Sequence, residues 1–161
     1  MFYKSTLPYP EIRVEKENIE YAKMLMYPYA SMVSEDTATH LYMFQSFILD
    51  DDIGKILENI AIVEMHHLEM LAKTINMLGL KPEYKSNDIP WTSNYVNYNT
   101  NLKEILKINI DAETLAIKNY QNLIKVIDDK YIKELLKRII IDEDIHLKIF
   151  NDLLNKTNQK S

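Results

Sequence analysis

The chain has 161 residues, of which 47% are hydrophobic and 27% charged, and its net charge is −5 at pH 7. This length fits one domain over residues 1–161, with enough apolar surface to bury a core. Its basic residues are spread among acidic ones, so no nucleic-acid partner is expected. Residues 1–10 lack the apolar stretch of a signal peptide. No apolar run approaches the roughly 18 residues of a membrane span, so we expect no membrane association and a cytoplasmic location.

The sequence contains no cysteine. Disulfides, iron–sulfur clusters, thiol catalysis and cysteine-ligated metals are therefore excluded. Two glycines and five prolines are too few turn residues for a β-sandwich or a barrel, so the composition favours an all-α fold. Any redox chemistry must use oxygen and nitrogen ligands.

Helical periodicity begins after an N-terminal extension, residues 1–19. It predicts a short helix over residues 18–26 and a long helix over residues 28–49. Pro28 should break or kink the join, because proline lacks an amide donor.

The second long helix is predicted to start at three aspartates, residues 50–52, which supply a turn and an N-cap. It should run to about Leu78, where Gly79 can adopt left-handed backbone and end the helix. Residues 80–101 lose the periodicity and hold a tryptophan, several tyrosines and several asparagines. We interpret them as a long crossover.

The third helix is predicted over residues 102–127, and the fourth runs from there to about Leu154. Residues 155–161 form a polar tail that we expect to be frayed. The four long helices are joined in chain order by a short loop, a long crossover and a short loop. This connectivity predicts an antiparallel four-helix bundle with one long crossover between helices two and three.

Two of these helices carry a Glu-x-x-His pair on the seam that should face the bundle core. The pairs are Glu64 with His67, and Glu143 with His146. Residues three apart lie on one helix face, so both side chains of a pair can reach one point. His66 should point off this seam, toward the surface or an interface.

The other two helices share a second pattern. Glu35 and Glu113 are each followed by alanine three residues later and by tyrosine seven residues later, Tyr42 and Tyr120. Alanine leaves room beside the carboxylate, and the tyrosine can offer it a hydroxyl, although core packing alone would also explain the tyrosines. The glutamates of each half are 29 and 30 residues apart, which indicates an internal duplication with a site on its axis.

Four buried carboxylates without partners would be prohibitively costly, and two divalent cations would neutralise them. Oxygen-rich ligands with one imidazole per metal suit iron or manganese, and the sequence does not choose between them. Two metals about 3.5–4 Å apart can bind peroxide or dioxygen. The alternative, salt-bridged glutamates on helix surfaces, would not repeat at matching seam positions. The predicted metal ligands are Glu35, Glu64, His67, Glu113, Glu143 and His146.

This pattern resembles the ferritin-like di-metal carboxylate superfamily, over about residues 20–153. The runs Ser34-Glu35-x-Thr37-Ala38 and Glu64-Met-His-His67 look like the manganese catalase and spore-coat branch. The run Asp142-Glu143-Asp144-Ile145-His146 is closer to rubrerythrins and bacterioferritins. Two features depart from rubrerythrins: Ala116 stands where they carry an extra glutamate, and the chain lacks the cysteines of a rubredoxin domain.

The resemblance implies a ferritin-like bundle with two iron or manganese ions that acts on hydrogen peroxide or dioxygen. Such a protein would be a binuclear non-haem catalase or peroxidase of oxidative-stress defence and a homo-oligomer, a dimer or larger. A catalase needs no outside reductant, whereas a peroxidase would need an external electron donor. Two alternatives remain open at this stage, a ferroxidase of iron storage and a spore-coat-like structural protein with a vestigial site.

Overall fold

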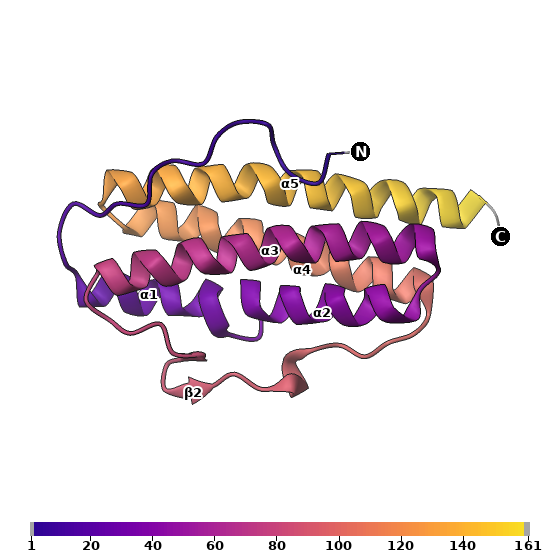
Figure 1. Cartoon of the computed structure of the whole chain (residues 1–161), viewed down its shortest axis with the longest axis horizontal. Coiled ribbons are helices and arrows are strands. Elements are labelled where there is room, and N and C mark those ends of the chain that lie inside the picture. Colours follow the sequence, from indigo (N-terminus) through magenta and orange to yellow (C-terminus); the bar gives the residue numbers. More distant parts are fainter. Residues whose placement is uncertain (1, 160–161) are drawn as a thin grey trace.

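The computed structural model describes residues 2–159 (Figure 1). Four rows of helix lie side by side, and the first row consists of two helices end to end. The predicted antiparallel four-helix bundle with one long crossover is therefore confirmed. No helix in the described part of the chain is both long and apolar enough to cross a membrane. The helices are α1 (Ile19–Ala30), α2 (Glu35–Ile48), α3 (Asp51–Met77), α4 (Leu102–Val126) and α5 (Lys130–Gln159).

Polar side chains cap the starts of these helices, as short side-chain acceptors commonly do. Asp50 accepts a hydrogen bond from the Ile53 amide at the start of α3, as the sequence predicted. Gly79 has φ = +96° just after α3, which is the left-handed backbone expected of it. The remaining caps are Asn18, Ser34, Asn101 and, ahead of α5, Asp129.

Pro28 was predicted to break or kink the first row of the bundle, but the helix does not break there. Pro28 lies inside α1, and the helix continues to Ala30. A proline so near the C-terminal end removes only one backbone hydrogen bond, which the last turn tolerates. The break falls at residues 31–34, where Ser34 donates to the Ser31 carbonyl at 2.6 Å. Glu35 is therefore the first residue of α2 and not part of a continuous helix.

Residues 80–101 return along the bundle as predicted, but they also contain a small hairpin that periodicity analysis missed. Its two central residues, Asn87 and Asp88, have φ of 49° and 60°. Asn and Asp tolerate this left-handed region better than other non-glycine residues, and two such residues make a tight hairpin turn. The elements of this segment are β1 (Lys85–Ser86), β2 (Ile89–Pro90) and the 3₁₀ helix η1 (Ser93–Tyr95).

The last helix is longer than predicted. Its sequence contains neither glycine nor proline, and it remains helical through residue 159. The tail expected to be frayed over residues 155–161 is thus helical for most of its length, and residues 160–161 lie outside the described part of the chain. The helix continues because nothing in its sequence interrupts the backbone hydrogen bonds.

The bundle has two apolar clusters with a polar layer between them. Along α3, Ala61 belongs to one cluster and Met70 to the other, and Glu64 and His67 come between them. Along α5 the two clusters come in the reverse order, and Glu143 and His146 stand between Ile139 and Ile149. The candidate ligands therefore lie in the middle of the bundle, with apolar packing on both sides.

Candidate metal centre

The structure brings all six predicted ligands to one point inside the bundle. Their exposed fractions are 4% or less. Glu35 comes from the first turn of α2 and Glu113 from the middle of α4, while α3 and α5 each supply a Glu-x-x-His pair. All four helix rows thus contribute, as the duplicated sequence pattern predicted.

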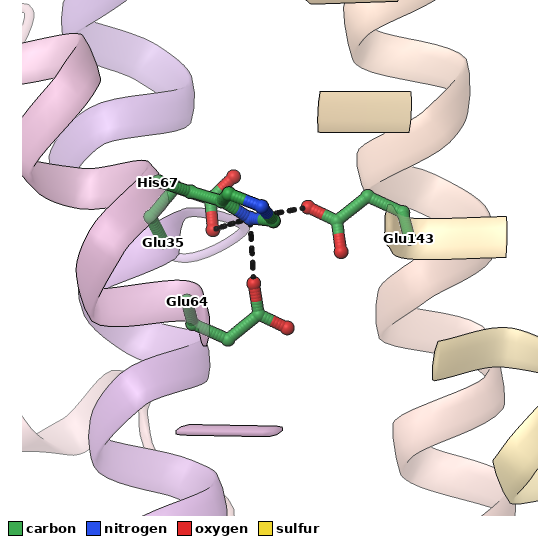
Figure 2. Close-up of side chains that lie close together, drawn as sticks. All are labelled: Glu35, Glu64, His67 and Glu143. Atoms are coloured by element: carbon green, nitrogen blue, oxygen red, sulfur yellow. Dashed lines mark hydrogen bonds and ion pairs between the residues drawn. The ribbon is translucent and has the colours of Figure 1, made fainter. Parts of the chain in front are cut away.

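The first half of the centre surrounds the Nδ1 atom of His67. This nitrogen lies 3.0 Å from Glu64 Oε2, 3.2 Å from Glu143 Oε1 and 3.6 Å from Glu35 Oε2 (Figure 2). The three carboxylates approach it from three different helices. One ligand atom from each of these four residues lies within 4.8 Å of the others, a spacing that could hold one metal ion.

The second half surrounds the Nδ1 atom of His146 in the same way. It lies 2.9 Å from Glu64 Oε1, 3.0 Å from Glu143 Oε2 and 3.9 Å from Glu113 Oε1. Glu64 and Glu143 each direct one carboxylate oxygen toward His67 and the other toward His146, so both residues belong to both halves. Carboxylates in this position can bridge two cations.

The donor set fits two divalent cations. Glu64 Oε1 is buried, and its ion-pair contact with His146 Nδ1 at 2.9 Å lacks the geometry of a hydrogen bond. Burial and then the charge of a neighbouring glutamate raise the pKa of Glu35 and Glu113. Burial lowers the pKa of His67 and His146, but the surrounding carboxylates outweigh it and hold both pKa values well above the ordinary one. These pKa shifts favour bound protons between the carboxylates of the metal-free protein, where cations would compensate the charge better.

The two tyrosines donate to the outer glutamates in a crossed arrangement. Tyr42 on α2 donates to Glu113 Oε1 on α4 at 2.6 Å, and Tyr120 on α4 donates to Glu35 on α2. The sequence pattern suggested a hydroxyl for the glutamate of the same helix. Seven residues span about 10 Å along a helix, however, so each hydroxyl instead reaches the glutamate of the antiparallel helix opposite. Burial raises the pKa of both tyrosines, which keeps them protonated donors.

Comparison with known proteins identifies the family. The sequence model described as Rubrerythrin matches residues 29–154, which is most of the chain. The chain belongs to the rubrerythrin family.

Individual relatives agree with this assignment. A probable manganese catalase of Clostridium acetobutylicum is 28% identical, with 93% of this chain and 77% of the relative covered. Protein CotJC of Bacillus subtilis is 27% identical over 93% of this chain and 90% of its own length. The crystal structure of a manganese catalase from Anabaena superposes with a TM-score of 0.89 at 26% identity, covering 98% of this chain and 81% of that one. These similarities confirm the ferritin-like fold and the resemblance to manganese catalases. The predicted cofactor, two manganese or iron ions, agrees with these names.

Two groups that hold the histidines from outside were missed in the sequence of this rubrerythrin-family protein. The Nε2 atom of His67 lies 3.1 Å from the Asp142 carboxylate, and that of His146 lies 2.8 Å from the Tyr3 carbonyl oxygen. Asp142 is completely buried. Its spacing of four residues from Arg138 on α5 was a usable signal for an ion pair, whereas nothing in the sequence pointed to Tyr3.

A small cavity of about 60 Å³ reaches the centre from the side of α2 and α4. Ala116, which replaces the extra glutamate of rubrerythrins, lies in its wall together with Ala38 and Ala112. The break between α1 and α2 contributes Met32 and Val33. The missing carboxylate thus leaves space beside the four glutamates.

Several other polar residues lie away from this centre. His40 is exposed. His66, which was predicted to point off the seam, is half-buried and pairs with the exposed Glu69 at 3.3 Å. Gln45 and Asn109 exchange two hydrogen bonds of 2.9 and 2.7 Å inside the bundle. The two side-chain amides therefore satisfy each other and are separate from the six candidate ligands.

Proposed function

We propose that this protein is a binuclear non-haem metal enzyme that disproportionates hydrogen peroxide. The observation that carries this proposal is the sharing of Glu64 and Glu143 between two histidine-centred halves. Two carboxylates that serve both halves favour a metal pair over two independent metal ions. Similarity to manganese catalases supports peroxide as the substrate.

A bound pair of redox-active metal ions supplies two-electron chemistry: one peroxide is oxidised to dioxygen, and another, with the two electrons and two protons released, is reduced to two waters. The six ligands would hold the ions, and the burial of these ligands keeps bulk water away from the centre. The hydroxyls of Tyr42 and Tyr120 steady Glu113 and Glu35, whose carboxylates would otherwise rotate.

The cavity supports a small, neutral substrate. Its volume of about 60 Å³ has room for only a few non-hydrogen atoms. Apart from the four glutamate ligands, the described residues in its wall carry no charge. A ferrous ion on its way to storage would meet no additional carboxylate there to replace its hydration shell, whereas peroxide needs none.

The test begins with metal content, measured by elemental mass spectrometry on protein purified without chelators, followed by oxygen evolution from peroxide. We expect two metal ions per chain and one dioxygen per two peroxides. Glu64→Ala and Glu143→Ala should abolish both metal binding and oxygen evolution. Glu69→Ala, which changes an exposed glutamate on the same helix as Glu64, should retain both properties. Full occupancy and activity in the two ligand variants would refute the proposal.

A second candidate is ferroxidase activity with iron storage. It is favoured by the bacterioferritin of Desulfovibrio desulfuricans, which is 32% identical over 72% of this chain. Ferrous iron would then be oxidised and retained in a large shell, so size-exclusion chromatography and iron loading distinguish it from a small oligomer that evolves oxygen. Protein that stays metal-free after reconstitution would favour the third candidate, a structural role like that suggested by the similarity to CotJC. Cytoplasmic location and homo-oligomerisation also remain parts of the proposal.

A further inference from the structure

The N-terminal segment runs along α5 (Figure 1), and its Tyr3 carbonyl oxygen lies 2.8 Å from His146 Nε2. We refer to residues 3–9 as the N-terminal strap. Its Ser5 amide donates to Asp142 Oδ1 at 2.7 Å, and the Tyr9 hydroxyl donates to the other oxygen of the same carboxylate. Its Tyr3 carbonyl faces His146. The strap therefore contacts the outer partners of both histidines.

Arg138 fastens the strap to α5. Its guanidinium donates to the carbonyl of Ser5 at 3.1 Å and to that of Leu7 at 2.9 and 3.0 Å. It also lies 2.7 Å from Asp142 and 4.1 Å from the centre of the Tyr9 ring. Because Arg138 is 5% exposed and Asp142 is fully buried, the two charges compensate each other away from water. The carboxylate can thus stay ionised beside the metal centre.

We propose that the N-terminal strap positions both histidines of the metal centre, through Asp142 for His67 and through the Tyr3 carbonyl for His146. The inference rests on the proposed metal binding, and not on which reaction follows. Asp142 and the strap are positioning groups because they act through the imidazoles and do not touch the cavity.

The acceptor chemistry fixes the tautomer of each ring. A backbone carbonyl can only accept, so Nε2 of His146 must carry the proton that faces Tyr3. An ionised carboxylate likewise only accepts, so Nε2 of His67 carries the proton that faces Asp142. In each neutral ring the lone pair is then on Nδ1, the atom directed at the shared glutamates. Outer partners of this kind orient metal-binding histidines and strengthen them as ligands.

The two anchors serve different halves of the centre, which makes the inference testable half by half. Metal-free protein is titrated with Mn²⁺ by calorimetry, and the product is examined by electron paramagnetic resonance. Asp142→Ala should weaken one of the two manganese sites by about 10- to 100-fold and replace the spectrum of a coupled pair by that of a single ion. Asp144→Ala, at an exposed position two residues away, should leave both sites intact.

Two further variants separate positioning from folding. Removal of residues 2–4 deletes the Tyr3 anchor but keeps Ser5 and Tyr9, and it should weaken the other manganese site by a similar factor. Asp142→Asn keeps an oxygen acceptor for His67 and should restore most of the affinity lost in Asp142→Ala. Wild-type affinity at both sites in the alanine and truncated variants would overturn the inference, as would an equal loss at both sites in each. Wild-type protein that binds two manganese ions without evolving oxygen would overturn only the proposed reaction.

Discussion

Metal binding should release protons and therefore weaken steeply as the pH falls. Without metal, the carboxylates around His67 and His146 hold the pKa of both imidazoles well above the ordinary value near 6.5. The raised pKa values favour protonated rings in the metal-free protein, and a protonated ring must lose a proton before Nδ1 can bind a cation. The pKa values of Glu35 and Glu113 are raised as well, so two protons per chain is a lower limit.

Each released proton changes the binding free energy by about 1.36 kcal/mol per pH unit at 25 °C. Two protons amount to about 2.7 kcal/mol per pH unit for the metal pair, or roughly a hundredfold in the product of the two binding constants. Lowering the pH from 7.5 to 6.5 should therefore reduce the product of the two binding constants by a factor of about 100 or more.

Calorimetric Mn²⁺ titrations in buffers of different ionisation enthalpy count the released protons directly, at constant ionic strength. A binding enthalpy that does not depend on the buffer, together with an affinity that is flat from pH 6.5 to 7.5, would refute the reasoning. Glu69→Ala, at an exposed position outside the candidate ligand set, provides the control and should release as many protons as wild type.

Three further predictions concern stability, and a fourth concerns oxygen evolution. The raised pKa values of the two histidines stabilise the metal-free protein fully below pH about 6.5, and this contribution is lost as the pH rises through the folded-state pKa values. Scanning calorimetry should therefore show an unfolding midpoint that falls with rising pH in metal-free protein but not in metal-loaded protein. Metal at 100 times its dissociation constant should raise the unfolding midpoint by about 5–10 °C per site, and a chelator should reverse this. In denaturant titrations, Gln45→Leu alone should cost about 1–3 kcal/mol because Asn109 loses its partner, whereas changing both residues to leucine should cost much less; equal costs would contradict this. Tyr120→Phe should lower oxygen evolution while two metals stay bound, since only the donor to Glu35 is removed; unchanged turnover would show that the hydroxyl has no role.

The sequence determined the helix rows and the composition of the centre. Apolar residues repeat with the helical period, and acidic and imidazole side chains interrupt that repeat at matching places on four segments. Buried charges demand compensation wherever they occur, so their presence on a core seam already indicated metal ions. The ends of α3 were also predictable, because Asp50 and Gly79 act through backbone groups only a few residues away.

Predictions from neighbouring residues failed at two places, the end of the first helix and the hairpin in the crossover. Proline was expected to break or kink the first helix row, but Pro28 stands near enough to the end of α1 for the helix to continue unbroken to Ala30. The hairpin at Asn87 and Asp88 was missed because strands of two residues have no detectable period.

Only the tertiary structure decided which group holds which ligand. Tyr42 and Glu113 are 71 residues apart, Tyr120 and Glu35 are 85 apart, and the Tyr3 carbonyl is 143 residues from His146. Helical periodicity assigns a side chain to a face of its own helix, but it carries no information on the residue that will stand opposite. The crossed tyrosine contacts follow from the antiparallel pairing of α2 and α4. The contact of the strap with His146 uses a backbone carbonyl, which any residue at position 3 would carry. Contacts made by backbone groups or across helices arise from packing, because a one-dimensional pattern fixes directions along a helix and not distances between helices.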